Sequence, residues 1–150
     1  MKTFRQLTEA KDTIVFTFGR FNPPTTGHEK LIEACKRAAG SNEFRVYPSF
    51  SQNPKKDPLP HSLKVAYMRK MFKKYARNIK ADKSAKTAIM IAENLYKEGF
   101  KNVIMVAGSD RVPEFTELLV RYNGQPDKKG NILYDFDSLK VVSAGERDPD

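Results

Sequence analysis

The stretch from Thr13 to Gly40 constrains the fold most, because an apolar run, a glycine, a proline-rich loop and a helix pattern follow one another there. The β-branched and apolar residues 13–18 predict a buried strand. After Gly19, the pair Pro23–Pro24 holds the chain extended, since proline fixes its own φ and restricts the residue before it. This order predicts a strand–turn–helix unit whose turn places backbone N–H groups where a phosphate can bind.

The helix of this unit has a clear start and a clear end. Thr26 followed three residues later by Glu29 fits a capping box, apolar residues then recur at helical spacing, and Gly40 is a typical stop. His28 falls in the first turn of this helix. A lone histidine there could simply cap an ordinary turn, but the whole string 19–28 favours a site that holds a nucleotide phosphate.

Residues 19–28 read G-R-F-N-P-P-T-T-G-H. The string resembles the signature of the nucleotidylyltransferase superfamily, which carries an (H/T)xGH motif and includes adenylyltransferases and cytidylyltransferases. The resemblance implies a Rossmann-like α/β fold, a parallel sheet with helices on both faces. It also implies an enzyme that transfers a nucleoside monophosphate from a nucleoside triphosphate to a small phosphorylated or hydroxylated acceptor, with release of pyrophosphate.

The same resemblance assigns roles within the motif. His28 and Thr25 are expected to contact the phosphates as catalytic residues. Thr25 stands where many members have a first histidine, and its hydroxyl brings no positive charge. The residues expected to bind the nucleotide are Gly19, Arg20, Phe21, Asn22 and Gly27. Arg20 and Asn22 are similar to adenylyltransferase strings, which favours ATP over CTP.

A lysine is expected to complete the phosphate site from a second loop. Residues 44–50 predict another strand, and the loop after it contains Lys55 and Lys56. The resembled family commonly has a lysine in this loop that reaches the nucleotide phosphates. Lys56 is the better match and Lys55 the reserve candidate. A lysine here would neutralise the charge that moves onto the leaving pyrophosphate.

The second half of the chain predicts a crossover back to the sheet. Residues 85–98 predict a helix that stops at Gly99, and the apolar run 102–107 predicts a buried parallel strand. Gly108 and Asp110 follow, resembling the family's G-x-D segment, and both are expected to lie at the nucleotide site. Asp110 has a second interpretation as the N-cap of the next helix. Two further runs predict the last strands, residues 132–136 and 139–143.

The chain departs from the family after that last run. The family usually has an S-x-T-x-x-R segment there, at another helix N-terminus that binds the triphosphate. Residues 143–150 read S-A-G-E-R-D-P-D and do not match it. We therefore expect residues 1–150 to be one domain, matching the family in layout over residues 12–143. It is either a fragment of a longer protein or a copy that has lost part of its phosphate site.

The excess of basic residues that gives the net charge of +9 lies in one segment. Residues 55–86 hold eleven Lys or Arg against two Asp, and the rest of the chain holds sixteen of each sign. Apolar residues at helical spacing in this segment predict a packed helix with a basic outer face. The expected inner residues are Leu63, Val65, Tyr67, Met68, Met71, Phe72 and Tyr75, and Lys64 is expected outside. Such a face attracts polyanions, or is a solvated lysine-rich surface.

Composition limits the remaining possibilities. No run has transmembrane length, the N-terminus lacks a signal core, and the lone Cys35 excludes a disulfide framework. We therefore expect a cytoplasmic protein, or a virion-associated one, because similar domains occur in tailed bacteriophages. No carboxylate cluster suggests a dedicated metal site, so Mg²⁺ is expected to arrive with the nucleotide.

Two alternatives to a transferase remain open. One is a non-catalytic module that keeps the fold and binds nucleic acid or a particle through the basic segment. The other is a nucleotide sensor that binds without turnover. The sequence identifies neither the acceptor nor the oligomeric state.

Overall fold

The computed structural model describes residues 12–19, 26–49, 61–82 and 86–144. Strands and helices alternate along most of the chain, as an α/β fold requires. Their bounds, in chain order, are β1 Thr13–Gly19, α2 Thr26–Ala39, β2 Glu43–Pro48, α3 His61–Met71, the 3₁₀ helix η1 Lys73–Asn78, α4 Ala88–Lys97, β3 Asn102–Ala107, α5 Val112–Arg121 and β4 Ser138–Ser143.

The four strands form one parallel sheet in the order β2-β1-β3-β4. β1 pairs with both β2 and β3, so that Ile14 lies between Glu43 on one side and Val103 on the other. The chain moves outward from β1 to β2 and then crosses back to β3. This reversal creates a topological switch point at the carboxyl ends of β1 and β3, where open α/β sheets bind ligands. The expected Rossmann-like architecture is confirmed.

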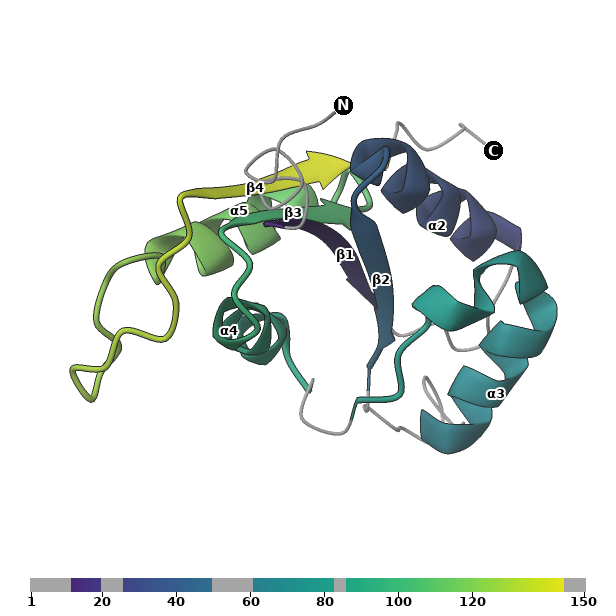
Figure 1. The fold of residues 1–150 in the computed structure, drawn as a ribbon, viewed down its shortest axis with the longest axis horizontal. Helices are drawn as coiled ribbons and strands as arrows, with labels where there is room; N and C mark the ends of the chain where they lie inside the picture. Colours follow the sequence, from purple (N-terminus) through teal and green to yellow (C-terminus); the bar gives the residue numbers. More distant parts are fainter. Residues whose placement is uncertain (1–11, 20–25, 50–60, 83–85, 145–150) are drawn as a thin grey trace, which may run out of the picture.

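Helices cover both faces of the sheet (Figure 1). On one face, α2, α3 and η1 enclose an apolar cluster that includes Val15 and Val46. On the other face, α4 and α5 enclose a second cluster that includes Ile14 and Phe16. Successive side chains of a strand point to opposite faces, which explains why neighbouring residues of β1 belong to different clusters. β1 therefore contributes to both layers.

The helix ends follow local chemistry. Thr87 caps α4, because its side-chain oxygen accepts a hydrogen bond from the Met90 N–H at 3.1 Å. Gly40 after α2 and Gly99 after α4 have φ of 59° and 103°, a region that favours glycine. Both predicted stops are confirmed. The predicted helix 85–98 is confirmed as α4, which starts slightly later, at Ala88.

The basic segment differs from its prediction. The expected inner residues Val65 and Met68 are buried. In contrast, Leu63, Tyr67 and Met71 are 50%, 55% and 47% exposed, so their predicted burial is wrong. The reason is geometric: positions 63, 67 and 71 form one stripe of α3, at a different angle around the helix from 65 and 68.

Lys64 also differs from its prediction. Expected on the basic outer face, it is fully buried. Positions 64, 65 and 68 lie on the same side of α3, because residues one and four apart both fall within an apolar-facing arc. The Lys64 Nζ donates a hydrogen bond to the Ser49 carbonyl at 3.1 Å. A buried polar head with such a partner is compatible with the core.

After α5, the predicted strand 132–136 is wrong. Ile132 and Tyr134 form only isolated bridges, with Pro126 and Asn123. Tyr134 is anchored differently, because its hydroxyl donates to the Leu119 carbonyl at 2.6 Å. The predicted strand 139–143 is confirmed as β4, and the predicted strand 44–50 as β2. Within the described ranges, no helix has the length and apolarity that a membrane span requires.

Candidate functional site

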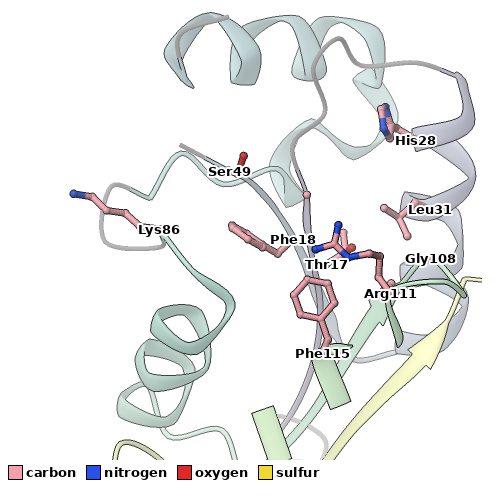
Figure 2. Close-up of a pocket in the computed structure, with 11 residues that line it drawn as sticks. Thr17, Phe18, His28, Leu31, Ser49, Lys86, Gly108, Arg111 and Phe115 are labelled. Atoms are coloured by element: carbon pink, nitrogen blue, oxygen red, sulfur yellow. The ribbon is translucent and has the colours of Figure 1, made fainter. Parts of the chain in front are cut away.

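A pocket of about 380 Å³ lies at the carboxyl ends of β1 and β3 (Figure 2). Both layers of the fold contribute to it, together with the strand ends between them. Its lining comprises Thr17, Phe18 and Gly19 of β1, His28 and Leu31 of α2, Ser49, Lys86, Ala107, Gly108, and Arg111 and Phe115 at the start of α5. The pocket therefore stands at the switch point that the topology predicts as a ligand site.

Backbone contacts hold the ends of β1 and β2 together at the rim of the pocket. The Ser49 N–H donates to the Gly19 carbonyl at 2.7 Å. The Ser49 carbonyl in turn accepts the hydrogen bond from the buried Lys64 ammonium. The Lys64 side chain thus connects α3 to Ser49, and through the Ser49 backbone to Gly19.

His28 lies in the first turn of α2 and lines the pocket, as predicted. Burial lowers its pKa below the ordinary value, because a partly desolvated imidazolium is disfavoured. At neutral pH the imidazole is therefore largely neutral and offers one N–H donor and one acceptor. An anion that enters the pocket would favour the charged form and raise that pKa again.

Arg111, at the start of α5, brings a permanent positive charge to the wall of the pocket that faces His28. It stands at the N-cap of α5, where its backbone N–H donates to the Gly108 carbonyl at 2.8 Å. The guanidinium carbon lies 5.1 Å from the centre of the Phe115 ring, and Nε donates to Glu114 at 3.0 Å. In Figure 2 the guanidinium extends from the start of α5 toward the pocket. The ring and the carboxylate together orient the side chain.

Asp110 is exposed and is absent from the residues that line this pocket. A Cβ built on Gly108 would lie 3.0 Å from the Asp110 Oδ1, so a side chain at position 108 would crowd the carboxylate. The interpretation of Asp110 as the N-cap of α5 is wrong, because Arg111 occupies that position and no side chain caps the helix. Gly108, the other residue predicted at the nucleotide site here, lines the pocket.

The side chains that line the pocket are unequal in charge. Lys86 and Arg111 are cationic, His28 can become so, and no Asp or Glu from the described ranges lines the pocket. Figure 2 shows Lys86 on the side opposite His28. Phe18, Leu31 and Phe115 supply apolar surface. A ligand with an anionic part and a flat apolar part matches this lining.

Several predicted site residues cannot be placed. Thr25, Lys56, Arg20, Phe21 and Asn22 lie outside the described residues, and the reserve candidate Lys55 does too. Gly19, predicted to bind the nucleotide, lines the pocket. Gly27 belongs to the first turn of α2, immediately before His28. Across the described part of the chain, no three of His, Cys, Asp and Glu come together as metal ligands.

Sequence reasoning missed Thr17, Ser49 and Arg111, and took Lys86 only as part of the basic segment. Thr17 and Ser49 stand at or just beyond the carboxyl ends of predicted strands, and Arg111 follows the predicted Gly108–Asp110 turn. The rule that ligands bind at strand carboxyl ends could have drawn attention to them. Nothing local distinguishes them from ordinary strand and loop residues.

Comparison with known proteins agrees with the fold. The sequence model of a family described as Cytidylyltransferase-like matches residues 16–142, which run from β1 to β4. A protein of Sulfurimonas denitrificans described as a probable nicotinate-nucleotide adenylyltransferase is 32% identical over 114 residues. The match covers 71% of this chain and 61% of that relative. The chain therefore spans only about three fifths of the relative's length.

Proposed function

The chain belongs to the cytidylyltransferase-like family of nucleotidyltransferases, and from this premise we propose that it transfers a nucleoside monophosphate from a nucleoside triphosphate to a small acceptor. One observation carries the proposal. Among the residues that the structure describes, the pocket at the switch point of the sheet is lined by His28, Lys86 and Arg111 and by no carboxylate. Such a lining favours a polyphosphate over a neutral or cationic ligand.

The proposed reaction is an in-line displacement at the α-phosphorus. An acceptor oxygen forms a bond to that phosphorus while its bond to the bridging oxygen breaks, and the electron pair leaves with pyrophosphate. The protein's part is to position the two reactants and to stabilise the charge that develops. We propose that His28 donates its N–H to a phosphate oxygen and that Thr25 and Lys56 contact the phosphates beside it. Mg²⁺ enters as part of the nucleotide substrate.

ATP and a nicotinate nucleotide are the substrates to test first. The string at residues 19–28 is similar to adenylyltransferase strings. The relative from Sulfurimonas denitrificans is described as acting on a nicotinate nucleotide. A phosphorylated acceptor of this kind also matches the cationic and apolar parts of the pocket.

Pyrophosphate release tests the proposal directly. The protein is incubated with Mg²⁺, with ATP or CTP, and with nicotinate mononucleotide or another phosphorylated acceptor. We expect release with one pair, and His28→Ala to lower kcat/KM by about 10²–10³-fold, the usual effect of losing one preorganised donor. Arg37→Gln, on an exposed position of α2, is the matched control and should leave the rate unchanged. Release that persists in His28→Ala would contradict the assigned role.

The surface of α3 and η1 supports a second candidate, binding of a polyanion such as nucleic acid. Residues 61–78 contain no Asp or Glu, and several of their cations are exposed: Arg69, Lys70, Lys73, Lys74 and Arg77. The test is binding of a single-stranded oligonucleotide at increasing salt. Replacing two of the contacting cations should lower the slope of log K against log salt by about 1.4. No binding at low salt would exclude this candidate.

A further inference from the structure

Thr17 carries a hydroxyl that the fold leaves unused. The residue is fully buried, and its Oγ1 has no hydrogen-bond partner within the described part of the chain. Buried polar groups are almost always hydrogen-bonded, and an unsatisfied one destabilises the folded state. Valine has nearly the same shape and would avoid this penalty. The hydroxyl at this position therefore suggests a partner other than the protein itself.

The position of Thr17 indicates where that partner binds. The side chain lines the pocket at the carboxyl end of β1, on the same wall of strand ends as Gly19 and Ala107. Figure 2 shows the Arg111 guanidinium extending toward the region where Thr17 lies. Glu114 accepts from Nε, and no other described residue accepts from the two terminal nitrogens of the guanidinium, which can donate to a ligand. A hydroxyl and a guanidinium facing one space provide donors for a tetrahedral anion.

We propose that Thr17 and Arg111 form a phosphate-binding subsite of the pocket, which holds the phosphate group of a phosphomonoester. The guanidinium supplies charge and directed N–H donors, and the buried hydroxyl donates to one phosphate oxygen. The ring of Phe115 beneath the guanidinium holds it over the pocket. The subsite rests on the proposed function only for the identity of the substrate that carries this phosphate.

The local electrostatics make a specific prediction about this subsite. Glu114 pairs with the guanidinium, and it offsets part of the positive charge. Removing this carboxylate should therefore strengthen phosphate binding, whereas removing a merely structural contact would not. The effect should be modest, because both side chains are more than half exposed.

The test uses inorganic phosphate as the probe, at constant ionic strength, with affinity measured by calorimetry and stability by thermal unfolding. Thr17→Val should weaken phosphate binding about 10-fold, the lower end of the effect of one hydrogen bond to a charged group, and Arg111→Gln about 10- to 100-fold. Glu114→Gln should bind phosphate more tightly than the parent. The Tm of Thr17→Val without phosphate should equal or exceed that of the parent, since valine leaves no orphaned hydroxyl.

Two variants on α5 serve as matched controls. Thr116→Val removes a hydroxyl that donates to the Val112 carbonyl at 2.7 Å, so it should lower Tm and leave phosphate affinity unchanged. Arg121→Gln removes an exposed guanidinium paired with Glu117 and should change neither. A wild-type protein that binds no phosphate, or variants at 17 and 111 that bind it normally, would overturn the proposal.

The outcomes separate this subsite from the proposed transfer. Phosphate binding with the expected pattern but no pyrophosphate release from any substrate pair would uphold the subsite and refute the transfer. Pyrophosphate release together with unchanged phosphate affinity in both variants would uphold the transfer and refute the subsite.

Discussion

The buried ammonium of Lys64 donates a hydrogen bond to the Ser49 carbonyl, and Ser49 lines the pocket. A core side chain of α3 is thereby connected to the rim of the candidate site. We expect Lys64→Ala to lower the free energy of unfolding by about 2–4 kcal/mol, because it leaves a cavity and removes a donor from a buried carbonyl. Urea denaturation measures the loss. Lys70→Ala, on the exposed side of the same helix, should change stability by less than about 0.5 kcal/mol. Equal small effects would show that Lys64 contributes little to the core.

Protonation of His28 should make stability depend on pH. Burial lowers its pKa below the usual value of about 6.5, so below that value the unfolded chain binds more protons than the folded one. The free energy of unfolding therefore falls as the pH drops from about 6.5 toward the lowered pKa. At neutral pH the imidazole is largely neutral in both states, so His28 causes no such loss of stability there.

Urea unfolding at a series of pH values checks this prediction. In His28→Gln, the slope of the unfolding free energy against pH should decrease by an amount that corresponds to at most about one proton. The remaining slope should include His61, whose pKa burial also lowers, and His61→Gln is the matched comparison. An unchanged slope in His28→Gln would contradict the burial of this imidazole.

Arg45 connects β2 to the end of α4. Its terminal nitrogens donate to Glu98 at 2.7 and 2.9 Å and to the Tyr47 hydroxyl at 3.2 Å, and Nε pairs with Glu43. Lysine cannot reproduce this forked geometry. We expect Arg45→Lys to lower the free energy of unfolding by about 1–2 kcal/mol.

The control for Arg45 is Arg121→Lys. Arg121 forms an exposed pair with Glu117 four residues earlier on α5, and such pairs contribute about 0.5 kcal/mol or less. Both variants are compared by urea denaturation at low and high salt. If the two substitutions reduced stability equally, the Arg45 cluster would be no stronger than a surface ion pair.

Cys35 should be chemically inert in the folded protein. Burial raises the pKa of its thiol to about 12, and the thiolate is the reactive form. Alkylation by iodoacetamide at pH 8 should therefore be slow in native buffer and fast in concentrated urea, as followed by mass spectrometry. Rapid labelling of the native protein would show that α2 opens readily.

The parts of the fold that were predictable are those where local chemistry and tertiary structure agree. The apolar run of β3 and the glycines that end α2 and α4 indicate their elements directly. α3 is different, because apolar side chains surround much of the helix and spacing alone does not select the inner face. The chain also leaves the α-helical conformation at Phe72, with φ −115° and ψ 56°. A single helical period therefore cannot describe residues 63–75.

The location of the candidate site was predictable from the sequence, but the full set of residues that line it was not. Gly19 and Gly108 are visible in the sequence because each directly follows a predicted strand, and His28 because it belongs to the motif at residues 19–28. Thr17 and Arg111 are recognisable as pocket residues only once the fold places the end of β1 near the start of α5. That placement depends on the order of the strands in the sheet. The burial of Lys64 likewise depends on the backbone of Ser49, fifteen residues away.

The sheet separates two apolar layers, which are covered by different helices (Figure 1). The pocket is the place where both layers face the same space (Figure 2). His28 and Leu31 belong to one layer, and Arg111 and Phe115 to the other. A ligand that contacts both pairs would connect the two layers directly, in addition to the sheet that lies between them. Its binding energy would then be shared by the whole molecule, and opening of either layer would first require the ligand to leave.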